Sequence, residues 1–214
     1  IYDIQEIENF DWLQEFEKQV NSIQINDKIG IAPTWKLNEL STDIKIEINP
    51  KMSFGTGEHS TTKLMCKLLD KYLEPKSVWI DAGCGTGILA ILASKLGASK
   101  VFAFDNDEWS IDNTKENIDL NNVNNVALEM SNIEDYNFPE VNGILANMFT
   151  NLLVSSMDKF KNALNKNHGF LILSGILIYD RDEVFNSAID NGFKLIEERT
   201  EDEWIAMVFE PKGN

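Results

Sequence analysis

The stretch VWIDAGCGTG, residues 78–87, runs directly into the apolar segment ILAILA, residues 88–93. An apolar run that ends in an acid predicts a buried strand, and three alternate glycines predict a tight turn. The segment after them predicts a helix. A strand, a glycine turn and a helix N-terminus offer a site for a nucleotide-like ligand at the carboxyl edge of a parallel sheet. We therefore expect fold and function to be organised around this turn.

Strands and helices alternate on both sides of the turn. The hydrophobic pattern predicts further strands over 101–105, 126–130, 144–147 and 170–173, and helices over 64–72, 87–96, 108–120, 150–164 and 182–190. Only an acidic segment separates the last two apolar runs, 193–197 and 204–209, so we expect them to pair antiparallel. The prediction is an α/β fold: a doubly wound, mostly parallel, seven-stranded Rossmann-like sheet with one antiparallel strand.

The first 50 residues have a different pattern. Apolar residues at helical spacing predict an amphipathic helix over 8–20, and an extended segment follows over 23–33. We expect a polar loop over 36–42 and a half-buried strand over 44–48, where isoleucines alternate with charged residues. The predicted organisation is an N-terminal helical and extended segment over 1–50 and one large domain over 51–214.

Composition limits the classes of partner and compartment. The chain has 214 residues, of which 43% are apolar, and no apolar run reaches the roughly 20 residues that a transmembrane helix needs. Cys66 and Cys84 lack metal-ligand spacing, so we expect no metal site and a reducing cytoplasm. A formal charge of −16 disfavours direct nucleic-acid binding and favours a basic protein partner.

The spacing of the turn narrows the choice of ligand. Its glycines follow the pattern G-x-G-x-G, and Ile88 stands where the dinucleotide fingerprint needs a glycine. Asp81 precedes the turn and can accept from a cationic amino group, and Asp105 ends the next predicted strand, where a carboxylate accepts ribose hydroxyls. These features favour S-adenosylmethionine over a nicotinamide cofactor, with Gly83 and Gly85 as binding residues. The alternatives are a helix-capping role for Asp81 and a solvated strand end at Asp105.

A second motif, FGTGEHSTT over residues 54–62, precedes the first. Its glycines let the backbone approach a ligand closely, and Thr61 and Thr62 fall at a predicted helix N-terminus that suits a carboxylate. His59 has three open roles: orienting this segment, touching a substrate, or making a structural hydrogen bond. We do not assign it a catalytic role.

The motifs, taken in order, resemble those of the bacterial ribosomal-protein lysine methyltransferases that modify the stalk-base protein L-eleven. The resemblance also covers DND at 105–107, LANM at 145–148, LSGIL at 173–177 and EW at 203–204. It implies S-adenosylmethionine as cofactor and cofactor contacts at Thr62, Gly83, Asp105 and Asn147. It also implies a protein amine as acceptor, most specifically a lysine of a ribosomal large-subunit protein.

The implied reaction assigns roles to further residues. Asn147 is the candidate catalytic residue, because its side-chain oxygen can orient an incoming amine. Phe54, Phe149 and Trp204 are candidates for the rim of the pocket, with core packing as the alternative. Asn132 or Ile133 is expected to flank the adenine.

Two questions stay open from the sequence. The family usually carries a recognition domain ahead of the linker helix, whereas only about 25 residues precede the matching region. That domain is either absent or trimmed. The rival functions are methylation of a nucleic-acid exocyclic amine, of a small molecule or of another protein, and cofactor binding without catalysis. The segment ANMF, residues 146–149, lacks the prolines typical of base-flipping amine methyltransferases.

Overall fold

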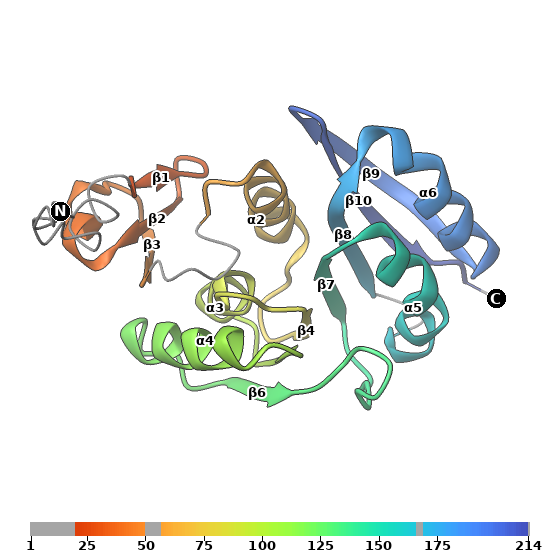
Figure 1. Ribbon diagram of the computed structural model, residues 1–214, viewed down its shortest axis with the longest axis horizontal. Helices are drawn as coiled ribbons and strands as arrows, with labels where there is room; N and C mark the ends of the chain where they lie inside the picture. The colour runs from red at the N-terminus through yellow and green to blue at the C-terminus, as the bar shows by residue number, and fades with distance from the viewer. Residues whose placement is uncertain (1–19, 50–56, 166–168, 214) are drawn as a thin grey trace, which may run out of the picture.

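The computed structural model describes residues 20–49, 57–165 and 169–213, and a seven-stranded sheet forms its centre. The strand order is β6-β5-β4-β7-β8-β10-β9 (Figure 1). The strands are β4 (Val78–Ala82), β5 (Lys100–Asp105), β6 (Val126–Met130), β7 (Gly143–Asn147), β8 (Phe170–Leu177), β9 (Phe193–Glu201) and β10 (Trp204–Pro211).

Strand direction agrees with the predicted fold class. The ladders from β6 to β8 are parallel, and both antiparallel ladders of this sheet involve β10, which pairs with β8 and with β9. Strand β10 alone therefore runs against the others. The predicted strand at 170–173 is longer than expected and continues to Leu177 along β10.

Helices cover both faces of the sheet. Helices α2 (Ser60–Tyr72), α3 (Ile88–Lys95) and α4 (Glu108–Leu120) lie on one side, and α5 (Thr150–Ala163) and α6 (Arg181–Asp190) lie on the other (Figure 1). Each face has its own apolar core: Met65 and Ile91 belong to the first, and Met157 and Phe160 to the second. Because the crossover helices bury both faces, the central strands read as continuous apolar runs.

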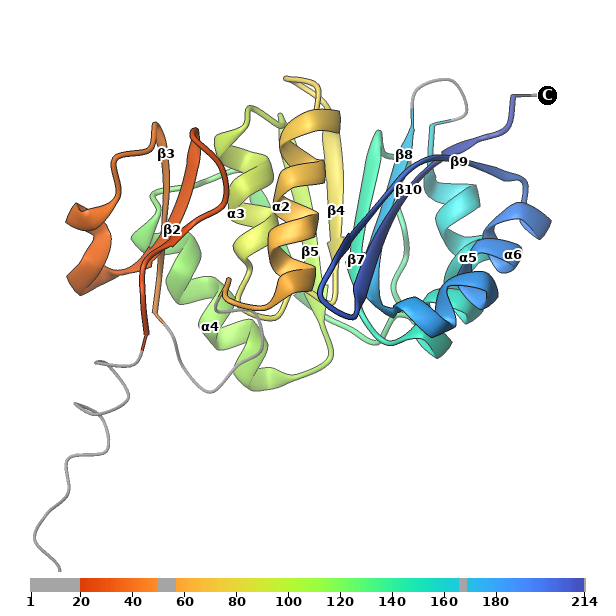
Figure 2. The same cartoon turned by 90° about the horizontal axis from the view of Figure 1, so that it is seen from above.

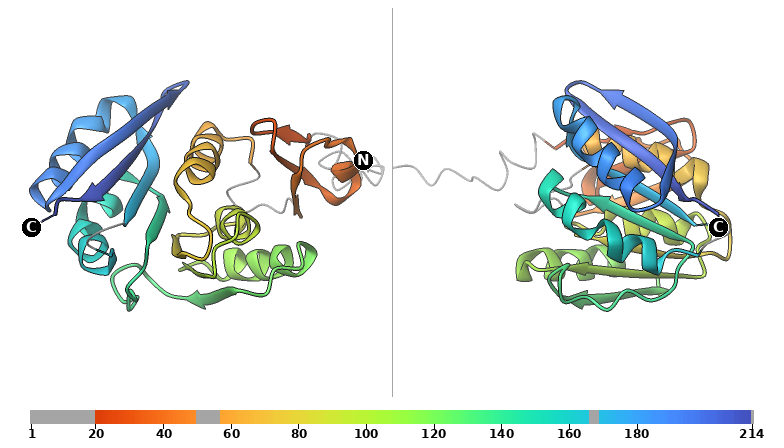
Figure 3. Two further views of the ribbon diagram at one scale, coloured as in Figure 1. Left: turned by 180° about the vertical axis from the view of Figure 1, so that it is seen from behind. Right: turned by 90° about the vertical axis from the view of Figure 1, so that its right-hand side faces the viewer.

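A small three-stranded sheet precedes the main one. Strands β1 (Ile23–Gln24), β2 (Ile29–Pro33) and β3 (Ile44–Ile48) form it, in that order. Seen from behind, it lies at the opposite end of the molecule from the β9–β10 hairpin (Figure 3). The loop expected over 36–42 is instead a 3₁₀ helix over Thr34–Glu39, which begins after Pro33 and ends with a bond from Leu40 N to Leu37 O. The helix predicted over 8–20 lies almost wholly outside the described residues.

Asparagines on α4 join the small sheet to the main domain. Asn121 Oδ1 accepts from the backbone N–H of Glu47 at 3.0 Å, and Asn117 Oδ1 accepts from that of Asn49 at 2.8 Å. The fully buried Asn117 also donates from Nδ2 to the carbonyl of Thr86, inside the glycine turn, at 2.8 Å. One side chain thus fixes both the end of β3 and the turn. No helix in the described part of the chain has the length and apolarity needed to cross a bilayer.

Candidate cofactor and substrate site

A cavity of about 630 Å³ opens at the carboxyl edge of the parallel strands, the edge that Figure 2 shows beside the start of α2 and the tip of the β9–β10 hairpin. Residues from seven segments line it. They are His59, Thr61, Gly83, Gly85, Phe104, Asp105, Asn106, Ser110, Ser131, Asn132, Ile133, Glu134, Asn147, Met148, Phe149, Leu152, Gly175 and Trp204. Four of the predicted cofactor residues, namely Gly83, Gly85, Asp105 and Asn147, are among them.

The glycine turn forms the floor of this cavity. The backbone N–H groups of Gly83 and Cys84 both donate to the carbonyl of Phe104, at 2.9 and 3.0 Å, which holds the turn against β5. Gly83 has φ of +70°, and a Cβ there would lie 3.2 Å from Met148 Cε. A side chain would be strained and would fill the space over the turn, so this position leaves room for a ligand to lie on the backbone.

The carboxylate of Asp105 is held beside the turn by backbone donors. Its Oδ2 accepts from Gly85 N at 2.9 Å and its Oδ1 from Asp107 N at 3.0 Å. Each oxygen keeps further lone-pair capacity toward the cavity, since an ionised carboxylate has about four acceptor positions. A preset carboxylate of this kind suits the two hydroxyls of a ribose.

Asp81 makes the helix-capping contact that the sequence offered as the alternative to a contact with an amino group. It is buried, and its Oδ2 accepts from the backbone N–H of Ala90, the third residue of α3, at 2.9 Å. Gly87 cannot cap this helix with a side chain, and Asp81 supplies the missing acceptor from the preceding strand. Burial raises the pKa of Asp81 to about 7, although the bond from Ala90 opposes the shift. Asp81 is absent from the described residues that line the cavity.

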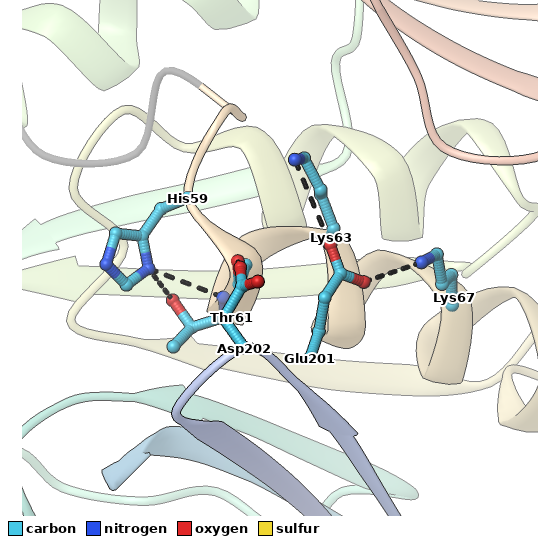
Figure 4. A network of polar contacts seen from close by, with 7 residues as sticks. His59, Thr61, Lys63, Lys67, Glu201 and Asp202 are labelled. Carbon is cyan, nitrogen blue, oxygen red and sulfur yellow. Dashed lines mark hydrogen bonds and ion pairs between the residues drawn. The ribbon is translucent and has the colours of Figure 1, made fainter.

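The start of α2 forms the opposite wall of the cavity. His59 is the N-cap, and its Nδ1 accepts from the backbone N–H of Thr61 at 3.3 Å (Figure 4). That bond requires a lone pair on Nδ1, so the Thr61 hydroxyl, 2.8 Å from the same nitrogen, donates to it. The Thr61 oxygen is then free to accept, and it accepts from Asn147 Nδ2 at 3.2 Å.

This chain of bonds fixes the amide of Asn147. Its nitrogen faces Thr61, and its Oδ1 is therefore the atom left over. Oδ1 is buried and has no hydrogen-bond partner among the described residues. A buried acceptor without a donor is costly, and the cost is removed if a ligand supplies the donor.

Thr62 points away from this wall. It is buried, it is not among the described lining residues, and its Oγ1 has no partner in the described part of the chain. Thr61 takes the place at the cavity that the sequence assigned to Thr62. One residue along a helix rotates a side chain by about 100°, so the doubled threonine did not show which of the two faces the ligand.

The far end of the cavity is bounded by the loops after β5 and β6. Asn106 Nδ2 donates to Asn132 Oδ1 at 3.3 Å, and Ile133 lies next to this pair. The ring of Phe104 forms part of the wall and stacks on Tyr136, with centroids 3.9 Å apart. Polar amides beside an apolar wall suit a flat heteroaromatic base, and the assignment of Asn132 or Ile133 to the adenine stays a prediction.

The mouth of the cavity has aromatic residues. Phe149, at the N-cap of α5, is 77% exposed, and Trp204 lines the cavity from the start of β10 with its ring centroid 4.9 Å from that of His59. The third predicted rim residue, Phe54, lies outside the described residues. The hairpin tip that precedes Trp204 is attached to α2, because Asp202 Oδ2 accepts from Ser60 Oγ at 2.5 Å. Glu201 also pairs with Lys67 at 2.8 Å (Figure 4).

Sequence reasoning missed several lining residues. Gly175 is one: its φ is +81°, and a Cβ there would lie 2.5 Å from the Met148 carbonyl oxygen. The sequence carried a signal for it, because Gly175 lies in the LSGIL segment, residues 173–177, although the strand predicted there ended at residue 173. Ser110, Ser131 and Glu134 had no such signal, because only the three-dimensional meeting of loops brings them to the cavity. The described residues contain no group of three His, Cys, Asp or Glu side chains that could hold a metal.

Comparison with known proteins agrees with this geometry. The family model described as ribosomal protein L11 methyltransferase (PrmA) matches residues 1–212. A protein of that name from Acetivibrio thermocellus is 37% identical over 204 residues, which cover 95% of this chain and 65% of its own length. Its counterpart from Clostridium perfringens is 37% identical over 199 residues, or 92% of this chain and 63% of its own length.

A solved structure shares the fold closely. The crystal structure of a ribosomal protein L11 methylase from Lactobacillus delbrueckii subsp. bulgaricus superposes with a TM-score of 0.83 at 26% identity. The match covers 89% of this chain and 98% of that one. The chain therefore spans just under two thirds of the curated relatives above, and nearly all of the solved one. On these grounds the chain belongs to the ribosomal protein L11 methyltransferase (PrmA) family.

Proposed function

We propose that this chain transfers a methyl group from S-adenosylmethionine to a lysine amine of a basic protein, and that ribosomal protein L11 is the acceptor. The observation that carries the proposal is the buried, unpartnered Oδ1 of Asn147, a residue that lines the cavity. Membership of the family supports ribosomal protein L11 as the acceptor, and the residues of the cavity support methyl transfer to an amine.

The residues of the cavity fit the cofactor. We assign the ribose hydroxyls to Asp105, the cofactor's path along the backbone to Gly83 and Gly85, and the methionyl carboxylate to the start of α2 through Thr61. Thr62 and Asp81 then support the site from behind, Thr62 beneath the α2 wall and Asp81 at the N-terminus of α3. When bound, S-adenosylmethionine supplies a methyl group on a positively charged sulfur.

The chain's task is to present a neutral amine at attack distance. A free lysine has a pKa of about 10.4, so its ammonium must lose a proton before it can attack. The partly apolar mouth, with Met148, Phe149 and Trp204, disfavours the charged form by desolvation. Asn147 Oδ1 accepts an N–H of the amine and so directs the nitrogen lone pair, while Thr61 and His59 hold the amide in place.

A labelling experiment tests the proposal. The chain is incubated with S-adenosylmethionine carrying a labelled methyl group and with ribosomal proteins that have not been methylated. We expect the label on lysine residues of L11, identified by mass spectrometry. Tight cofactor binding without any labelled product would favour a non-catalytic module, and label in RNA or in small molecules would favour the rival methyltransferases.

We also place the reaction in the cytoplasm, where the free thiols of Cys66 and Cys84 stay reduced.

A further inference from the structure

An apolar surface continues outward from the mouth of the cavity. Phe149 is 77% exposed, Tyr179 is 79% exposed and Ile178 is 45% exposed. Phe149 precedes α5, and the other two lie in the 3₁₀ helix Ile178–Asp180 after β8. Large side chains so exposed, and gathered on adjoining loops, mark an interaction surface more often than chance scatter does.

Hydrogen bonds show that the loops adjoin. Thr150 Oγ1 lies 3.4 Å from Asp180 Oδ2, to which it donates, so the start of α5 touches the 3₁₀ helix. The backbone N–H of Ile178 donates to the carbonyl of Glu203 at 3.0 Å, which ties the same helix to the tip of the β9–β10 hairpin. Glu203 directly precedes Trp204 of the cavity wall. The three loops therefore form one surface that leads into the cavity.

The polar part of this surface is acidic. Glu134 lines the cavity and is exposed, and Glu203 is exposed on the hairpin. The cations of adjoining segments are engaged: Arg181 binds Glu198 and Asp182 at 2.7 and 2.8 Å, and Lys159 bonds the backbone carbonyls of Ile133 and Glu134. We call Phe149, Ile178, Tyr179, Glu134 and Glu203 the mouth surface.

We propose that the mouth surface docks the segment of the acceptor protein that carries the target lysine; this rests on the proposed function. An aromatic and aliphatic surface packs against the methylene stem of the target lysine, and the carboxylates attract the basic residues that neighbour it. The chain's net charge of −16 acts in the same direction over longer distances. Nucleic acid is the poorer occupant, because its phosphates would meet Glu134 and Glu203.

Steady-state methylation of purified ribosomal protein L11 tests this proposal with two variants, Tyr179→Ser and Glu203→Lys. Neither residue is assigned to the cofactor site. We expect KM for L11 to rise about three- to tenfold in each, with kcat and the cofactor Kd changed by less than about twofold. The effect of Glu203→Lys should shrink at high salt, since it is electrostatic.

Two matched variants serve as controls. Tyr179→Phe keeps the ring and should keep the KM of the unaltered chain. Glu74→Lys makes the same charge change at an exposed residue just beyond the far end of α2, and should leave KM unaltered.

The outcomes separate the two proposals. If the unaltered chain labels L11 and both test variants keep its KM, the docking surface is wrong while the function stands. An equal rise of KM in Glu74→Lys would reduce the effect to net charge and also overturn the docking surface. If the unaltered chain binds cofactor but labels RNA, or nothing, the proposed function falls and the docking proposal with it.

Discussion

Asn147 and Thr61 lie 86 residues apart in the sequence, and their side chains are joined by a bond of 3.2 Å between Nδ2 and Oγ1. The bond links the end of β7 to the first turn of α2, and both residues line the cavity. Because Nδ2 makes this bond, Oδ1 is the amide atom that can accept from a substrate. The two residues are therefore one unit in the proposed reaction, and each yields a prediction.

Replacing Asn147 by alanine should abolish turnover while leaving the fold intact. The variant removes the acceptor that directs the amine, so we expect kcat to fall by roughly 100-fold or more. The melting temperature should fall only modestly, because the lost oxygen has no partner in the described structure and the variant breaks a single hydrogen bond, from Nδ2 to Thr61. Full activity in this variant would remove Asn147 from the mechanism.

Thr61→Val tests whether the reaction needs the hydrogen bond that holds the amide of Asn147. Valine keeps the shape but neither accepts from Asn147 nor donates to His59, so kcat should fall by about tenfold. Thr61→Ser keeps the hydroxyl and should restore most of the activity. Equal loss in both variants would point to packing of the methyl group instead of the bond.

The hydrogen bond between Asn147 and Thr61 also shows which features of the site could not be predicted from the sequence. The secondary structure could be predicted closely, because strands buried on both faces and helices with clear caps, such as Asp107 on α4, carry local signals. Motif order pointed to Gly83, Asp105 and Asn147 without any structure. The sequence could not show that Thr61 and not Thr62 faces the cavity, or that Asp81 turns toward α3. Side-chain direction at a helix start or strand end depends on packing against distant segments, and local pattern does not contain it.

Asp105→Ala should weaken cofactor binding. The loss of a charge-assisted contact to hydroxyls costs about 1.5–3 kcal/mol, which corresponds to a Kd roughly 10- to 150-fold higher. Isothermal titration calorimetry with S-adenosylmethionine measures the change directly. The variant also frees the backbone N–H of Gly85, so circular dichroism should confirm the fold. Unchanged affinity would show that the ribose lies elsewhere.

Asn117→Ala should destabilise the protein without touching the cavity. It removes the bonds to Thr86 in the glycine turn and to Asn49 after β3, both 2.8 Å long and in or near the buried interior. We expect the free energy of unfolding in urea to fall by about 2–4 kcal/mol. Asn162→Ala on the exposed face of α5, where the amide donates to Asp158 at 3.1 Å, should cost less than about 0.5 kcal/mol. A similar loss in both would argue against the bridging role of Asn117.

Asp81→Asn should change how stability depends on pH. Burial raises the pKa of Asp81 from 3.8 to about 7 in the folded protein, so between these pH values the folded state binds a proton that the unfolded chain releases. The stability contributed by this group therefore falls as the pH rises from about 4 to about 7. Asparagine still offers an oxygen to Ala90 N but does not ionise. The free energy of unfolding of the variant, minus that of the unaltered chain, should thus increase with pH by up to roughly 4 kcal/mol and level off above pH 7.

Urea unfolding of both proteins at pH 5 and pH 8 measures this difference in the free energy of unfolding. Taking the difference cancels the contributions of the other carboxylates, which both proteins share. A difference that is the same at both pH values would mean that Asp81 is ionised in the folded protein throughout this range.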